Sequence, residues 1–150
     1  MSNKNESGRT ISKVLATGTF DILHVGHINY LTYAKSLGDY LFVHIESDRA
    51  VKRHKGQKRP IINQTDRQKI INSLKIVDET FIADGEKDAK KILQKFKPQV
   101  LVLAPKSTFD VKIKEAELKN ILPNLKVVWY AKPSEQSTSI IIDQIIKNFR

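Results

Sequence analysis

Residues 13–39 read KVLATGTFDILHVGHINYLTYAKSLGD, and this stretch decides the class of fold. It opens with a short apolar run at Lys13–Ala16 and passes into a glycine-containing loop. From Gly26 to Leu37 apolar residues recur every three positions, which is the spacing of one helix face, and Gly38 follows as a stop signal. The stretch therefore predicts a strand, a loop and an amphipathic helix in that order.

The rest of the chain repeats this alternation of strand and helix. Nearly continuous apolar runs, typical of strands covered on both faces, predict further strands at Tyr40–Ile45, Thr80–Ala83, Val100–Leu103 and Val127–Tyr130. Helices are expected from Thr65, at Ala89–Phe96, weakly over Asp110–Leu122, and at Ser137–Phe149. Right-handed crossovers between such strands give a doubly wound α/β fold, so we expect a five-stranded, Rossmann-like parallel sheet with helices on both faces.

Two helix boundaries in this prediction depend on local signals. Thr65 and Gln68 have the spacing of a capping box, and Pro98 ends the helix that precedes it. The region at 46–62 is polar and basic around Gly56, and we expect a loop there that holds a short helix at most.

The length of 150 residues fits one domain, which we place at residues 13–150 after a polar, disordered tail at 1–12. Hydrophobic residues make up 40% and charged residues 28%, and no apolar run approaches the roughly 20 residues of a membrane span. The polar N-terminus offers no secretory signal, and the chain has no cysteine for disulfides or thiolate zinc sites. We therefore expect a cytoplasmic protein without a membrane partner.

The formal net charge of +10 indicates an attraction for anions in general. The 26 Lys and Arg residues are spread along the whole chain, and they do not gather with aromatic residues into a stripe that follows a nucleic-acid backbone. A lysine-rich solvated surface is the simpler interpretation, so we expect no nucleic-acid partner. A basic nucleic-acid-binding domain stays an alternative, and salt-dependent DNA or RNA binding is its test.

The loop after the first expected strand carries two histidines, His24 and His27, where the helix begins. In a doubly wound sheet this loop usually belongs to the ligand site. A spacing of three places both imidazoles on one side of a helical turn, and the free N–H groups of a helix N-terminus favour phosphate. Gly18 and Gly26 let the backbone come close to a ligand. The pattern predicts a phosphate site, with a zinc site or a simple helix cap as alternatives.

The segments Gly18–Asp21 and His24–His27 together resemble the signature of the cytidylyltransferase-like nucleotidyltransferases. That family includes glycerol-3-phosphate cytidylyltransferases, heptose-phosphate adenylyltransferases and archaeal FAD synthetases. Further landmarks match it in order and approximate spacing over roughly residues 13–148, namely Lys55-Gly56, Arg59-Pro60, Arg67, Val77-Asp78 and Ser137-Thr138-Ser139. The resemblance implies an enzyme that moves AMP or CMP from a nucleoside triphosphate to a small phosphorylated acceptor, a sugar or polyol phosphate, and releases pyrophosphate.

The resemblance also implies which residues take part in the reaction. The two motif histidines of this family contact the triphosphate and stabilise the transition state, a role that falls to His24 and His27. Lys55 from the basic loop and Arg67 at a helix start take the place of cations on the phosphates, and plain surface charge is the alternative for both. Arg59 has no special claim, and we expect it to be solvated.

Nucleotide contacts are implied at Thr19, Phe20, Gly26, Ser137, Thr138 and Ser139. Thr19 and Phe20 are expected to contact the nucleotide through backbone groups. Ser137–Ser139 offer hydroxyl and N–H groups at a helix N-terminus, although Ser137 also fits an ordinary N-cap. Asp21 is placed facing the acceptor or its metal. Mg²⁺ is the implied cofactor because it offsets the charge of the triphosphate, and a twofold homodimer is implied as well.

The match is weakest at residues 104–110, where relatives carry a glycine and an acidic residue but this chain reads APKSTFD. Lys106 in this loop either meets an acceptor phosphate or is an ordinary loop lysine. The loop at Lys55–Pro60 and the Ser137-Thr138-Ser139 segment look most like the heptose-phosphate adenylyltransferases, which favours ATP over CTP. The absence of the glycine and the acidic residue from residues 104–110 counts against this likeness. A catalytically silent nucleotide-binding or regulatory module of the same fold is the alternative to an enzyme.

Overall fold

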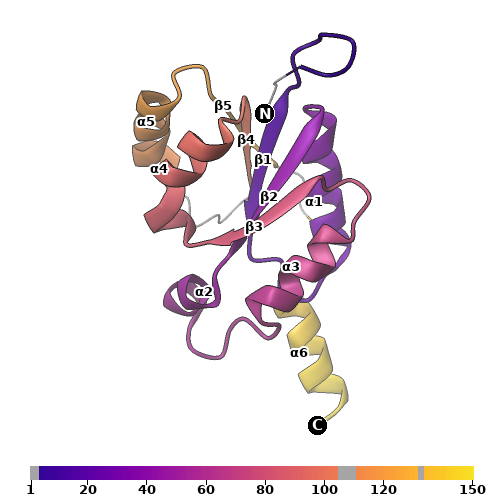
Figure 1. Ribbon diagram of the computed structural model, residues 1–150. Helices are drawn as coiled ribbons and strands as arrows, with labels where there is room; N and C mark the ends of the chain where they lie inside the picture. The colour runs from indigo at the N-terminus through magenta and orange to yellow at the C-terminus, as the bar shows by residue number, and fades with distance from the viewer. Residues whose placement is uncertain (1–3, 105–110, 132–133) are drawn as a thin grey trace.

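The computed structural model describes residues 4–104, 111–131 and 134–150, along which strands and helices alternate (Figure 1). The strands are β1 (Lys13–Gly18), β2 (Tyr40–Glu46), β3 (Glu79–Ala83), β4 (Val100–Leu103) and β5 (Lys126–Trp129). The helices are α1 (Val25–Ser36), α2 (Asp48–Lys55), α3 (Gln64–Asn72), α4 (Gly85–Phe96), α5 (Val111–Ile121) and α6 (Thr138–Asn148). None of the helices in the described part of the chain is long and apolar enough to cross a membrane.

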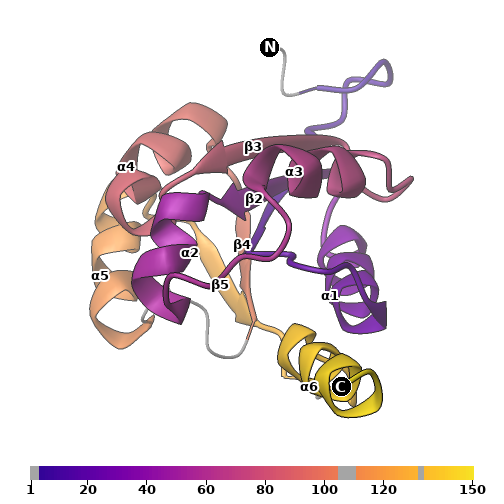
Figure 2. The same ribbon diagram turned by 90° about the horizontal axis from the view of Figure 1, so that it is seen from below.

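The strands are all parallel and lie in the order β3-β2-β1-β4-β5, which confirms the doubly wound sheet expected from the sequence. Strand order reverses between β1 and β4. β1 pairs with β2 as far as Gly18 but with β4 only as far as Ala16, so the two central strands part at their carboxyl ends. Ligands of doubly wound sheets bind outside this point. Figure 2 shows α2 and α6 at this end of the molecule.

Two apolar layers cover the sheet, because successive side chains of a strand point to opposite faces. One layer joins strand residues to α1 and α3 and includes Val14, Leu31, Val43 and Ile71. The other joins strand residues to α4 and α5 and includes Leu15, Phe42, Leu93, Leu101 and Leu118. The same two pairs of helices lie on opposite faces in both views (Figure 1 and Figure 2). Packing of these two layers holds in place the carboxyl ends of the strands, where the site lies.

α2 is an eight-residue helix in the region where the sequence predicted a loop and allowed a short helix. Ser47 caps it by accepting a hydrogen bond from the N–H of Ala50 at 3.2 Å. Ala50 and Val51 are the buried residues of this helix, so it leaves almost no hydrophobic periodicity in the sequence. Basic residues fill its last turn, where the helix dipole favours positive charge.

Two helices begin at residues other than those expected, because a different side chain provides the cap. Asn63 Oδ1 accepts a hydrogen bond from the N–H of Asp66 at 3.0 Å, so α3 starts at Gln64 and Thr65 lies inside it. Asn is among the strongest N-cap residues and prevails over the Thr65 capping box. α4 starts at Gly85, earlier than expected, because Asp84 caps it.

The N-terminal segment departs from the disordered tail expected at 1–12. Lys4 and Thr10 form an antiparallel bridge, so the described residues of the tail fold back on themselves. Asp39 anchors the segment, since it accepts from Arg9 Nη2 at 2.5 Å and from the N–H of Ser12 at 2.9 Å. Figure 1 shows this segment at the end of the molecule opposite α6.

Candidate active site

The two motif histidines lie side by side at the start of α1. His24 is the N-cap residue, and its Nδ1 accepts a hydrogen bond from the N–H of Gly26 at 3.1 Å. The rings of His24 and His27 are stacked, with centroids 3.8 Å apart and planes inclined by 28°. The expectation that both imidazoles share one side of a helical turn is confirmed. Because Nδ1 of the capping ring accepts, its proton is assigned to Nε2, which is then a donor.

Burial keeps both imidazoles neutral. It lowers the pKa of His24 below the ordinary value for histidine. It also lowers the pKa of His27 to about 3, with repulsion from His24 and Lys55 adding to the effect and Asp21 opposing it. His27 Nδ1 is buried and has no hydrogen-bond partner among the described residues. At neutral pH each ring therefore carries one N–H group that can donate to a phosphate oxygen.

The low pKa of His27 predicts a pH-dependent stability. Between pH 6.5 and about 3 the unfolded chain binds a proton at His27 that the folded chain does not, so the free energy of unfolding falls as the pH falls through this range. Above pH 6.5 both states are neutral and the effect disappears. Denaturant unfolding at about pH 7.5 and about pH 5 should show a larger loss for the wild type than for His27→Gln. Equal losses would contradict a half-buried His27 that stays neutral in the folded chain.

A strained backbone holds the loop between β1 and α1. Phe20 and Ile22 have φ angles of 54° and 53°, in the left-handed region that bulky and β-branched residues avoid. The Phe20 ring is 4% exposed and folds back over Gly18, where a Cβ atom would approach it to 2.9 Å. The same ring packs edge-on against His27, with centroids 5.4 Å apart. Phe20 thus supports His27, and its backbone is the part that can meet a nucleotide.

Tyr30 is a buried polar residue of the site region that the sequence interpretation missed. Its hydroxyl donates to the carbonyl of Val102 at 2.7 Å and accepts from the N–H of Thr17 at 3.1 Å. It therefore joins β1 to β4 where their own pairing stops. Burial raises the pKa of Tyr30, so the phenol stays protonated and keeps its donor. A tyrosine on an otherwise apolar helix face was the signal that could have found it.

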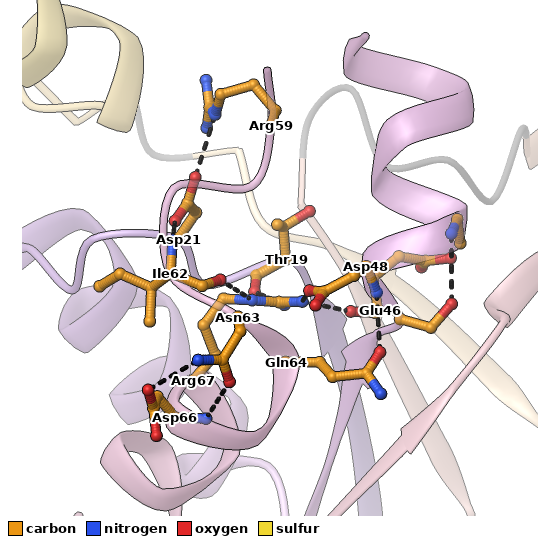
Figure 3. A network of polar contacts seen from close by, with 12 residues as sticks. Thr19, Asp21, Glu46, Asp48, Arg59, Ile62, Asn63, Gln64, Asp66 and Arg67 are labelled. Atoms are coloured by element: carbon orange, nitrogen blue, oxygen red, sulfur yellow. Dashed lines mark hydrogen bonds and ion pairs between the residues drawn. The ribbon is translucent and has the colours of Figure 1, made fainter. Parts of the chain in front are cut away.

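Arg67 has 0% exposure, and this corrects its expected place on the phosphates. Its Nε donates to the carbonyl of Ile62 at 2.9 Å, and its Nη1 donates to that of Thr19 at 2.5 Å. Nη2 donates to the carbonyl of Glu46 at 2.9 Å and to Asp48 Oδ1 at 2.7 Å. Figure 3 shows the guanidinium among these acceptors. Because the chain itself uses all three nitrogens, Arg67 positions the Thr19 loop and does not face a ligand.

Asp21 is also buried, with 1% exposure, which corrects the expectation that it faces the acceptor or its metal. Oδ2 accepts from Arg59 Nε at 3.0 Å and from the N–H of Ile61 at 2.9 Å. Oδ1 accepts from the N–H of Ile62 at 2.9 Å. Arg59, which the sequence placed in solvent, is thus paired with Asp21, and its side chain is 16% exposed (Figure 3).

Lys55 is the last residue of α2 and is exposed. Partial burial of its ammonium lowers the pKa of Lys55, the Arg59 cation adds to this, and Asp21 opposes it. The positive charge of Lys55 in turn helps to lower the pKa of His27. The effect of the Lys55 charge on His27 is consistent with the expected cation near the histidine pair, which stays a prediction.

Gly26 allows the chain before α6 to reach the start of α1. A Cβ atom at this position would meet Ser134 Oγ at 2.7 Å and His24 Cε1 at 2.9 Å. The N-terminal approach to α6 and the N-terminus of α1 therefore meet, which favours an anion between them. Lys106 lies outside the described residues, and its expected contact with an acceptor phosphate stays a prediction.

The three hydroxyl residues at the start of α6 differ in their surroundings. Ser137 is the N-cap, and its Oγ accepts from the N–H of Ile140 at 3.2 Å, as the capping alternative required. The Thr138 hydroxyl donates to the carbonyl of Asp21. Ser139 is exposed. The first two hydroxyls thus bind the chain's own backbone, and the N–H groups of the first helical turn are the better candidates for phosphate contact.

Metal ligands do not gather around the histidine pair. Within residues 4–104, 111–131 and 134–150, no group of three or more His, Cys, Asp or Glu side chains could hold a metal ion. A catalytic zinc site needs three protein ligands, so the zinc alternative has no support in this part of the chain.

The profile of the family described as Cytidylyltransferase-like matches residues 15–149. The chain belongs to this family. A FAD synthase of Thermococcus sibiricus is 39% identical over 140 residues, which cover 91% of this chain and 94% of that protein. A FAD synthase of Methanosarcina acetivorans is 40% identical over 146 residues, which cover 95% and 93%. A solved lipopolysaccharide core biosynthesis protein of Thermoplasma volcanium has a TM-score of 0.70 at 36% identity, with 83% of this chain and 99% of that chain covered.

Membership of the cytidylyltransferase-like family identifies the chain as a nucleotidyltransferase, an enzyme that moves a nucleoside monophosphate. The family expected from the histidine motif is confirmed, and so is the Rossmann-like fold. The nucleotide and the acceptor are the parts of the reaction that remain to be assigned.

Proposed function

We propose that this nucleotidyltransferase transfers AMP from ATP to the phosphate of FMN and so forms FAD and pyrophosphate. The observation that carries the proposal is the likeness to two FAD synthases, at 39% and 40% identity over more than nine-tenths of each chain. FAD consists of FMN joined to AMP through a pyrophosphate bond, so adenylyl transfer to FMN makes it in one step. The proposal chooses FMN over the sugar and polyol phosphates expected from the sequence, and ATP over CTP.

In the proposed reaction a phosphate oxygen of FMN attacks the α-phosphorus of ATP, and pyrophosphate leaves from the opposite side. Negative charge on the oxygens around the reacting phosphorus is what the protein must stabilise. The stacked, neutral rings of His24 and His27 donate N–H groups to these oxygens, and Lys55 supplies a positive charge. The N–H groups at the start of α6 bind the departing phosphates. Positioning and charge stabilisation therefore carry the reaction, without a covalent intermediate.

Mg²⁺ enters the proposal with the triphosphate. The described residues form no protein cage for a metal ion, so they do not replace the phosphate and water oxygens that Mg²⁺ prefers. When bound, Mg²⁺ offsets the charge of the triphosphate. The chain's own groups orient the nucleotide and bind the reacting oxygens.

Two exposed apolar side chains whose backbones adjoin the site residues are candidates for contact with an acceptor that has an aromatic ring system. Val25 lies between the two motif histidines in the sequence and is 55% exposed. Ile61, whose backbone binds Asp21, is 57% exposed. Apolar surface at a ligand site favours an apolar ligand. The isoalloxazine ring of FMN offers such a surface, whereas a sugar phosphate offers hydroxyl groups.

Pyrophosphate release tests the assignment when ATP and CTP are each combined with FMN, glycerol 3-phosphate and a sugar 1-phosphate in the presence of Mg²⁺. We expect the fastest release with ATP and FMN, together with an equal amount of FAD. Faster release with a sugar or polyol phosphate would overturn the choice of acceptor. If ATP raises the melting temperature but no acceptor yields product, the chain is the silent nucleotide-binding module.

Lys55→Ala is expected to lower kcat/KM for FAD formation roughly ten- to hundredfold, because a hydrogen bond to a charged group contributes about 1.5–3 kcal/mol. Lys52→Ala is the matched control, since Lys52 is an exposed lysine one turn earlier in α2 and should leave kcat/KM unchanged. Steady-state kinetics on both variants make the comparison. Equal small effects of the two substitutions would mean that Lys55 contributes only to the general positive charge of the surface.

A further inference from the structure

Asp21 joins three segments of the chain that are far apart in the sequence. Its carboxylate accepts from Arg59 Nε at 3.0 Å and from the backbone N–H groups of Ile61 and Ile62 at 2.9 Å. Its carbonyl accepts from the Thr138 hydroxyl at the start of α6. The motif loop, the loop at 56–62 and α6 are therefore connected through one residue.

Each connected segment carries a group that the proposed function uses. His24 and His27 follow Asp21 within the strained loop. Lys55 directly precedes the loop at 56–62, and Gly56, with a φ of 89°, turns the chain between the lysine and the residues that the carboxylate binds. The first turn of α6 supplies the N–H groups for the departing phosphates. The distances between these groups thus depend on the bonds to one residue, through its carboxylate for the loop at 56–62 and through its backbone carbonyl for α6.

We propose that Asp21 is a positioning residue that holds the loop at 56–62, and with it Lys55, beside the histidine pair. Its effect on catalysis rests on the proposed function. Both carboxylate oxygens are already hydrogen-bonded and the residue is 1% exposed, so it binds neither the acceptor nor a metal. Burial opposes ionisation of this carboxyl, but the N–H groups of Ile62 and Ile61 and the Arg59 cation outweigh it and lower the pKa of Asp21. The carboxylate therefore keeps its charge at neutral pH.

A double-mutant cycle separates positioning from direct contact. We would measure kcat/KM for FAD formation with the wild type, Asp21→Asn, Lys55→Ala and the double variant. Asn keeps the shape of Asp but loses the charge and one acceptor oxygen. Asp21→Asn should cost roughly tenfold or more in the wild type but less than about threefold once Lys55 is absent. If the fold-losses in kcat/KM of the two single variants multiply in the double variant, Asp21 acts independently of Lys55 and the proposal is overturned. A raised Mg²⁺ requirement of Asp21→Asn also overturns it, because it indicates direct contact with the metal.

Trypsin cleavage of the loop provides a readout that does not depend on turnover. Trypsin cuts after Lys55 and Lys58, and its rate there reports how often the loop detaches. Asp21→Asn should be cut at these sites several-fold faster than the wild type, while the other sites keep their rates. Arg59→Gln removes one of the three hydrogen bonds to the carboxylate. It replaces Asp21→Asn in the cleavage assay if Asp21→Asn does not fold.

Asp39→Asn is the matched control for both readouts. Asp39 likewise accepts from an arginine, Arg9, and from a backbone N–H group, that of Ser12, but it lies just before β2 at the amino ends of the strands. Its replacement should leave loop cleavage and FAD formation unchanged. Unchanged loop cleavage in both Asp21→Asn and Arg59→Gln overturns the proposal even if the wild type forms no FAD. Faster loop cleavage in a wild type that forms no FAD supports the positioning role and counts against the proposed function alone.

Discussion

Replacing His27 with alanine is expected to lower kcat for FAD formation by about 10²–10³-fold, the usual loss when one donor to a developing oxyanion is removed. The free energy of unfolding should fall by only about 1 kcal/mol. The small effect on folding follows because His27 is partly exposed and its buried Nδ1 has no hydrogen-bond partner among the described residues. Steady-state kinetics and denaturant unfolding of the same preparation measure both quantities.

His54→Ala is the control for this substitution, since His54 is an exposed histidine of α2 outside the stacked pair. Its kcat and its free energy of unfolding should stay close to those of the wild type. If His27→Ala instead unfolds the protein while the folded fraction keeps its turnover, His27 is a structural residue and the paired-histidine site is wrong.

Replacing Arg67 with methionine is expected to lower the free energy of unfolding by about 3–5 kcal/mol, as is typical when one partner of a buried ionic network is removed. Arg67 has 0% exposure, and methionine fills much of its volume without offering a donor. The carbonyls of Thr19, Ile62 and Glu46 would each lose a hydrogen bond. Chemical denaturation measures the loss, and turnover should fall with it because the motif loop is no longer held.

Arg9→Met is the control for the buried arginine. Arg9 pairs with Asp39 at 2.5 Å, but its side chain is 65% exposed, so its removal should cost about 0–1 kcal/mol. Normal stability of Arg67→Met combined with a large loss of kcat would contradict the positioning role and restore the phosphate contact expected from the sequence.

The sheet was predictable because a buried parallel strand needs little beyond a continuous apolar run. Val100–Leu103 is buried at every position and has the bounds that its composition suggested. The helices that were predicted less exactly had weaker signals. α2 buries Ala50 and Val51 on a short, basic helix, and the Asn63 cap prevailed over the equally spaced signal at Thr65.

The stacked histidine pair was predictable because its members are three residues apart, and within one helical turn the spacing in sequence is also the spacing in space. The hydrogen bonds and ion pairs of the buried charged residues were not predictable from the sequence. Asp21 meets Arg59 across 38 positions, and Arg67 meets Thr19 across 48 positions. A charged residue in a sequence is expected at the surface or on a ligand, and only the folded chain shows that its partners are internal.

Transfer of radiolabel from the α-phosphorus of ATP to FMN, in the presence of Mg²⁺, tests most directly whether the histidine pair catalyses adenylyl transfer. We expect the wild type to place the label in FAD and to release an equal amount of pyrophosphate. In the double variant His24→Ala/His27→Ala, label transfer should fall by at least about 10²-fold while ATP still binds. Label transfer at the wild-type rate in the double variant would contradict the paired-histidine mechanism, and no labelled FAD from the wild type would contradict the choice of ATP and FMN as substrates.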